Sequence, residues 1–123
     1  MSAMTTVGRN MKIEVAEPDR EAVRRFFCDV MGCDREEPMP ALDLFLFADG
    51  FRLGVYYLPA GHGDVLTAAQ YMHAPWIELC VDDVDGVTAT LATHGVTPFD
   101  YVDRQHRYFQ APGGLVFRLA PRG

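Results

Sequence analysis

The hydrophobic and polar positions of residues 76–95 predict a strand, a cap, a helix and a stop. Apolar side chains occupy every second position of residues 77–81, which is typical of a β-strand with two different faces. Asp82 and Asp83 are suited to cap a helix, and the apolar residues beyond them recur at helical spacing. Gly95 follows this pattern and can adopt the left-handed conformation that ends a helix.

The first half of the chain repeats this plan 64 positions earlier (77 − 13). An Ile-Glu-aliphatic triplet, an acidic cap, a helix, a glycine stop and a glycine-led apolar run follow in the same order. Chance would explain one common triplet but not this shared order, and one unit fills half of the chain. A duplicated fold is therefore favoured over a solenoid. The matching pairs are Ile13 and Ile77, Asp19 and Asp83, and Gly50 and Gly114.

The remaining pattern completes each half. Asp49-Gly50 joins two apolar runs, residues 42–48 and 51–58, and is a strong hairpin signal. A helix is predicted from Pro18 to about Met31, with Arg20, Arg24 and Arg25 on its solvated face. Further strands are predicted over residues 11–16, 33–37, 97–102, 106–110 and 115–120, with a helical turn around residues 65–71. The predicted organisation is a tail (1–10), a first module (11–58), a linker (59–75) and a second module (76–121).

Several of these segments resemble the vicinal oxygen chelate superfamily, which includes glyoxalase I, extradiol dioxygenases and bleomycin resistance proteins. In the second half the resemblance rests on residues 77–85 (IELCVDDVD), 95–98 (GVTP), 108–109 (YF) and 112–117 (PGGLVF). In the first half it rests on Asp19, Phe26-Phe27, residues 29–32 and the glycine-led last strand. The resemblance implies an α+β fold of two βαβββ modules in one domain, each module folding a short sheet around a concave pocket.

Size and composition fit a single globular domain. The chain has 123 residues, of which 49% are hydrophobic, and a formal net charge of −6, which disfavours nucleic acid as a partner. No apolar run approaches the roughly 20 residues of a membrane span, and the N-terminus has no hydrophobic signal region. Cys28, Cys33 and Cys80 lack metal-ligand spacing, so we expect reduced, mostly buried thiols in a cytoplasmic protein.

The resemblance also implies four metal-ligand positions, on the first and last strand of each module, which are usually His, Glu or Gln. Here these positions fall on Lys12, Gly54, Trp76 and Arg118, with Tyr56 next on the face of Gly54. Two are cations, one has no side chain and one offers only an N–H donor. We therefore expect no metal and no cofactor at the usual place, which argues against glyoxalase and dioxygenase activity.

A different metal site, built from Glu14, Glu78 and His106, is the alternative. Glu14 and Glu78 lie two residues beyond Lys12 and Trp76, so they share the same strand face. The favoured interpretation is that each glutamate pairs with a cation such as Arg118 or Lys12, because a buried carboxylate needs such a partner.

The residues that replace the metal ligands have the chemistry of a small-molecule pocket, in which flat rings give contact area and a few polar groups set orientation. The predicted ligand-binding residues are Trp76, Tyr56, Glu78, Glu14, Arg118, Lys12 and His106. Alternatively, Trp76 and Tyr56 simply fill the cavity.

Three functions follow from this pattern. The leading hypothesis is a metal-free protein that binds a small aromatic or charged organic molecule, as bleomycin resistance proteins do. The second is a divergent lyase or isomerase, with Glu78 or Glu14 as base and Arg118 as oxyanion stabiliser. The third is a module that acts through protein contacts alone. Modules of this kind bury edge strands against each other, within a chain or across a two-fold axis, so a homodimer is expected.

Overall fold

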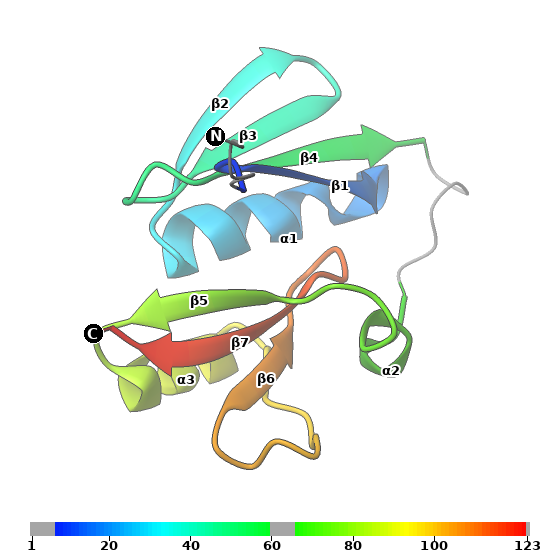
Figure 1. The fold of residues 1–123 in the computed structure, drawn as a ribbon. Coiled ribbons are helices and arrows are strands. Elements are labelled where there is room, and N and C mark those ends of the chain that lie inside the picture. Colours follow the sequence, from blue (N-terminus) through cyan, green and yellow to red (C-terminus); the bar gives the residue numbers. More distant parts are fainter. Residues whose placement is uncertain (1–6, 60–65, 123) are drawn as a thin grey trace, which may run out of the picture.

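Two mixed β-sheets, each packed against a helix, form the α+β fold that the sequence predicts (Figure 1). The computed structural model describes residues 7–59 and 66–122. The strand order is β1-β4-β3-β2 in the first sheet and β5-β7-β6 in the second, and the first and last strands of each module are parallel neighbours. The strands are β1 (Asn10–Ala16), β2 (Asp34–Met39), β3 (Leu42–Leu46), β4 (Arg52–Leu58), β5 (Ile77–Val81), β6 (Arg107–Gln110) and β7 (Val116–Pro121).

The helix of the first module changes its hydrogen-bonding pattern along its length. It begins as the 3₁₀ turn η1 (Glu17–Asp19), continues as α1 (Arg20–Arg24) and ends as the π-helical segment η2 (Arg25–Val30). Pro18 lies in the first turn, where its missing N–H costs no intrahelical hydrogen bond. The buried side chains on its inner face are Val23, Phe26 and Phe27.

The helix of the second module, α3 (Val84–Thr93), begins at the predicted cap. The carboxylate of Asp83 accepts a hydrogen bond of 3.0 Å from the N–H of Gly86. Gly95, with φ of 78°, ends the helix as expected. The short helix α2 (Ala68–Tyr71), which is capped by Thr67, precedes β5.

The strand predicted over residues 97–102 is wrong. Between α3 and β6 the chain forms a loop. Within the described structure, one isolated β-bridge, between Phe99 and Tyr108, joins this loop to β6. Pro98 lacks the N–H that a continuing ladder would need. The second sheet therefore has three strands, and the loop of residues 97–106 takes the place of the fourth.

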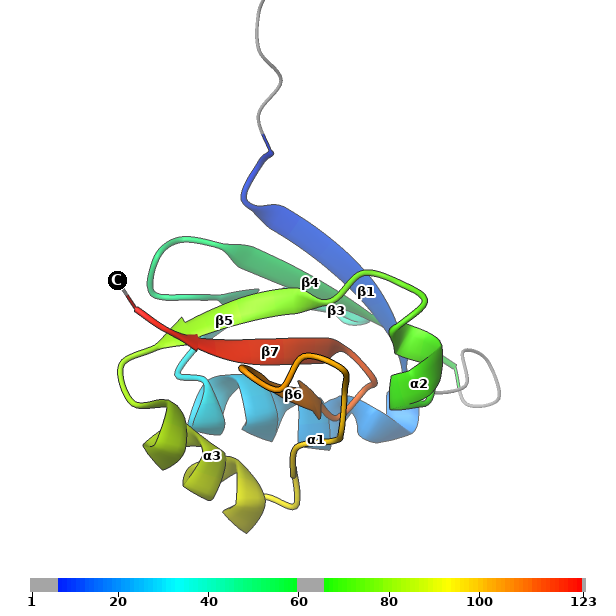
Figure 2. The ribbon, with the colours of Figure 1, turned by 60° about the horizontal axis from the view of Figure 1, so that its bottom comes forward.

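One hydrophobic core joins the two modules. Phe117 of β7 lies edge-on to Phe26 of η2, with ring centroids 5.5 Å apart, and stacks on Phe109 at 5.3 Å. In Figure 2, α1 and α3 both lie below β7, which agrees with this contact. Gly113 allows the second module to pack closely against the first, because a Cβ at this position would lie 3.0 Å from the side chains of Val15 and Val23.

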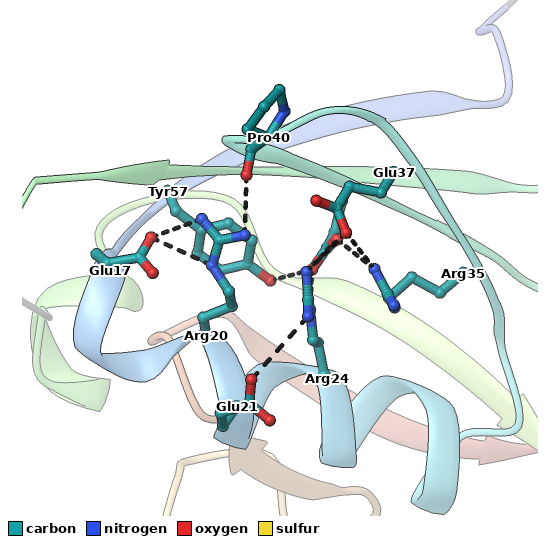
Figure 3. Close-up of polar contacts among 9 residues, drawn as sticks. Glu17, Arg20, Glu21, Arg24, Arg35, Glu37, Pro40 and Tyr57 are labelled. Atoms are coloured by element: carbon teal, nitrogen blue, oxygen red, sulfur yellow. Dashed lines mark hydrogen bonds and ion pairs between the residues drawn. The ribbon is translucent and has the colours of Figure 1, made fainter.

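A network of ion pairs and hydrogen bonds joins the helix of the first module to its sheet (Figure 3). Asp43 of β3 is 0% exposed, yet its carboxylate is fully bonded. It accepts hydrogen bonds from Arg24 (2.8 and 3.1 Å), Arg35 (3.0 Å) and the hydroxyl of Tyr57 (2.7 Å). Burial raises the pKa of Asp43, but these three donors together outweigh burial and hold that pKa below its usual value.

This network corrects the expectation for the helix arginines. Arg24 reaches the buried carboxylate, and Arg20 bonds Glu17 and the carbonyl of Pro40 while lying 4.3 Å above the ring of Tyr57. Neither lies on a purely solvated face, whereas Arg25 is exposed. Helical periodicity does not report these contacts, because Asp43 lies 19 residues beyond Arg24 and Pro40 lies 20 residues beyond Arg20.

The cysteines match the expectation only in part. All three are free thiols, but Cys80 is exposed, because it lies on the outer face of the edge strand β5. Cys33 is buried, and burial raises its pKa to about 12, so its thiol is unreactive at neutral pH. Among the described residues, no helix is long and apolar enough to span a membrane.

Candidate ligand-binding face

Three polar side chains form a row across the outer face of the second sheet. Strand register places Glu78 of β5 and Tyr108 of β6 on either side of Arg118 of β7. The Nε of Arg118 donates to Glu78 at 2.8 Å, and its Nη1 donates to the hydroxyl of Tyr108 at 3.3 Å. These contacts hold the pKa of Arg118 above its ordinary value, so the guanidinium is a fixed positive charge.

Trp76 covers this row. The guanidinium carbon of Arg118 lies 4.5 Å from the centroid of the Trp76 ring, which is a cation–π contact. The same ring meets Tyr108 edge-on at 5.7 Å. Trp76 and Arg118, which were both predicted to bind a ligand, thus lie at the same face and contact each other.

The loop before β6 adds two further groups. Asp103 Oδ2 lies 2.7 Å from Nδ1 of His106, accepts from the hydroxyl of Tyr108 at 3.0 Å and lies 3.5 Å from Arg118. The N–H of Gln105 donates to its other oxygen at 2.9 Å. The backbone donor of Gln105, followed by His106, lowers the pKa of Asp103 to about 2, so its carboxylate is ionised at neutral pH. We call Trp76, Glu78, Asp103, His106, Tyr108 and Arg118 the Arg118 cluster.

Sequence reasoning missed Asp103 and the aromatic cover of the loop. Tyr101 and Phe99 pack on the ring of Tyr108, with centroids 4.9 and 6.2 Å away, so that Tyr108 is only 2% exposed. The expected strand at residues 97–102 concealed this arrangement, because the sequence does not show that the segment pairs with β6 at a single bridge and otherwise forms a loop. The density of aromatic and charged residues in residues 99–108 was the available signal.

The predicted residues of the first module lie elsewhere. Lys12 and Glu14 of β1 form an exposed ion pair of 3.0 Å, and Tyr56 lies on β4 opposite Glu14. Among the described residues, no hydrogen bond or ion pair joins them to the Arg118 cluster. The chain thus brings together Trp76, Glu78, Arg118 and His106 of the seven predicted residues, and leaves Lys12, Glu14 and Tyr56 on the other sheet.

The residues at the four positions that the resemblance implies for metal ligands do not fit a metal ion. In the first module Lys12 lies opposite Gly54, whereas in the second Arg118 lies opposite Glu78 and not Trp76, a register difference of two residues. The guanidinium of Arg118 therefore occupies the centre of the row, where a divalent cation would be repelled. No group of three or more His, Cys, Asp or Glu side chains in the described ranges could hold a metal ion.

A cavity of about 310 Å³ adjoins the cluster at the free edge of β5. Its walls are mostly apolar, with Met31, Phe47 and Phe51 from the first module and Ile77, Leu79 and Val81 from β5. Glu78 lines both this cavity and the Arg118 cluster. The cavity volume lies at the lower end of the range of small-molecule sites.

Solved structures with this fold cover almost the whole chain. The fosfomycin resistance protein FosX from Listeria monocytogenes is similar over 94% of this chain and 91% of its own, with a TM-score of 0.71 and 14% identity. A glyoxalase/dioxygenase from Nostoc punctiforme is similar over 99% of both chains (0.68, 15%), and glyoxalase I from Leishmania major over 95% and 87% (0.67, 19%). No protein-family model and no curated protein matches the sequence.

These similarities define the class of fold. The order of the strands and the matches over nearly the full chain show that this protein has the fold of the glyoxalase and FosX structures, which confirms the resemblance expected from the sequence. Because each identity is below 20%, the likeness establishes the fold and not the chemistry.

Proposed function

We propose that this protein binds a small aromatic or charged organic molecule at the Arg118 cluster, without a metal ion. The observation that supports this function best is the row of Glu78, Arg118 and Tyr108 beneath Trp76, at the place where relatives would need metal ligands. A ring and a few fixed charges at one surface are the usual equipment for orienting an organic ligand.

The charges of the cluster favour a cation over an anion. Two carboxylates, Glu78 and Asp103, flank the single guanidinium of Arg118, and the whole chain has a formal net charge of −6. The FosX structure was solved with Mn(II) and a dihydroxypropylphosphonic acid, which is an anion. We expect this chain to disfavour such an anion, because Arg118 already has acidic partners.

A homodimer would complete the site. β1 and β5 are edge strands that do not pair with each other, and the outer face of the first sheet carries Leu42, Leu44 and Tyr56 beside Lys12. We propose that a partner's first sheet lies over the Arg118 cluster, which would bring Tyr56 to the ligand. Sedimentation of micromolar protein should show a dimer, and a single monomer boundary would contradict this arrangement.

Trp76 permits a direct binding test, because it is the only tryptophan of the chain and reports from the site itself. Benzamidine and benzoate are similar in shape and opposite in charge. Benzamidine should change the tryptophan emission saturably, with a lower Kd than benzoate.

The variant Glu78→Gln removes one of the two carboxylates. It should weaken benzamidine by about tenfold, the equivalent of roughly 1.4 kcal/mol, and strengthen benzoate. The matched control is Glu21→Gln, since Glu21 is exposed on α1 and far from the cluster in sequence and module. Equal affinity for both probes in all three proteins would refute the proposed site.

The compartment is also a proposal. Three free thiols, one of them exposed, suit the reducing cytoplasm, as the cysteine pattern predicts.

A further inference from the structure

The carboxylate of Asp103 is held in place by several neighbouring side chains and one backbone N–H. Its carboxylate has four polar neighbours: the N–H of Gln105, Nδ1 of His106, the hydroxyl of Tyr108 and the guanidinium of Arg118. These neighbours come from the loop, from β6 and from β7, so the carboxylate cannot rotate without breaking several contacts. His106 is therefore held at 2.7 Å by a rigid acceptor.

This geometry decides which imidazole nitrogen carries the proton. An ionised carboxylate only accepts hydrogen bonds, so Nδ1 of His106 must be the donor. In the neutral imidazole Nε2 then holds the free electron pair. Asp103 thus selects the tautomer in which Nε2 is a base, in the way that an orienting acid serves a catalytic histidine.

The basic nitrogen remains accessible. The side chain of His106 is 29% exposed, and within the described structure its Nε2 has no hydrogen-bond partner. Tyr108 and Arg118, which contact the same carboxylate, connect His106 to the ring of Trp76. His106 and Trp76 thus belong to one network of contacts, which runs through Asp103, Tyr108 and Arg118.

We propose that His106, held by Asp103, is a general base that removes a proton from an aromatic carbon acid bound at the Arg118 cluster. This inference rests on the proposed binding function. In the step, the C–H bond breaks, the proton passes to Nε2, and the electron pair moves into the conjugated system of the substrate. Asp103 stabilises the imidazolium, and return of the proton at another atom of the substrate completes an isomerisation without a co-reactant.

The test uses 5-nitrobenzisoxazole, a flat aromatic probe that needs only a base. Transfer of its ring C–H proton to Nε2 forms a nitrile as the N–O bond breaks, and the leaving oxygen becomes a coloured phenolate. His106→Gln should lower kcat by about 100-fold, the lower end of what a positioned base supplies, with KM nearly unchanged. The control His73→Gln should keep the wild-type rate, because His73 is exposed beside α2, outside the cluster.

Asp103 is a positioning residue and needs its own readout. Asp103→Asn should lower kcat in the same direction, and ¹⁵N spectra should show that His106 loses its preference for the Nδ1–H tautomer. Thermal melts establish whether Asp103→Asn is folded. If it is not, His106→Gln still tests the base, because it leaves Asp103 and its contacts with Gln105, Tyr108 and Arg118 in place. A wild-type spectrum dominated by the Nε2–H tautomer would overturn the proposal.

Binding and catalysis can fail separately in this design. Quenching of Trp76 by the probe reports binding, whereas phenolate release reports proton transfer. Saturable quenching with equal rates in wild type and His106→Gln would end the role of His106 and leave the binding function standing. A probe rate no higher than that of His106→Gln, together with no change of Trp76 emission by the probe or by benzamidine, would remove both.

Discussion

Replacing Asp43 with asparagine is expected to lower the free energy of unfolding by about 3 kcal/mol. Removing one member of a buried charge network typically costs about 3–5 kcal/mol, because the remaining charges lose their compensation. Arg24 and Arg35 would keep only Glu37 as a shared carboxylate, and the buried hydroxyl of Tyr57 would lose its charged acceptor. We choose the lower end of the range because both arginine side chains are partly exposed.

Urea unfolding of Asp43→Asn and wild type measures this loss. The matched control is Asp82→Asn, whose carboxylate pairs with Arg122 at the surface and should change stability by less than about 0.5 kcal/mol. Equal stability of the two variants would show that the network contributes nothing.

The same network predicts an acid-dependent loss. The pKa of Asp43 is lower in the folded protein than in the unfolded chain, so its contribution is fully present above the unfolded value of about 3.9. That contribution disappears as the pH falls through the lower, folded value. Asp43→Asn should lack this part of the acid transition.

Truncation of Phe117 to alanine is the second change with a large expected effect. Phe117 is buried and contacts rings from both modules, Phe26 and Phe109. Loss of a buried phenylalanine typically costs about 3–5 kcal/mol through lost burial and a residual cavity. The unfolding midpoint should fall strongly, since the contact joins the two sheets through one core.

Thermal and urea unfolding of Phe117→Ala test this result, with Phe51→Ala as control. Phe51 lines the cavity beside β5 and is only partly buried, so its loss should be smaller. If both variants lost the same stability, Phe117 would not be the link between the modules.

Much of the fold was predictable because local signals and the global pattern agreed. Asp83 and Gly95 delimit α3, and Asp49-Gly50 turns β3 into β4, as their side chains and backbone freedom require. The strand predicted over residues 97–102 is wrong for a physical reason. A loop that packs on a sheet can show the same pattern of apolar residues as a strand. Whether such a segment pairs or packs depends on hydrogen bonds that periodicity does not encode.

The polar partners were harder to predict. Asp43 lies in an apolar run, and the three groups that bind it come from a helix and two other strands, so only tertiary structure assembles them. In the second sheet the resemblance implied Trp76 and Arg118 as equivalent site positions, and the strand register places Glu78 opposite Arg118. Glu78 and Arg118 were recognised as site residues, whereas Asp103 depended on the path of a loop.

Titration of the single tryptophan after metal removal tests whether the Arg118 cluster binds its ligand without a metal ion. Protein treated with a chelator and confirmed free of metal is titrated with benzamidine, alone and with added Mn²⁺ or Zn²⁺. We expect the same saturable change at Trp76 and the same Kd in each case, because Glu78, Asp103 and the indole ring make the site. Binding that appears only with stoichiometric metal would contradict it.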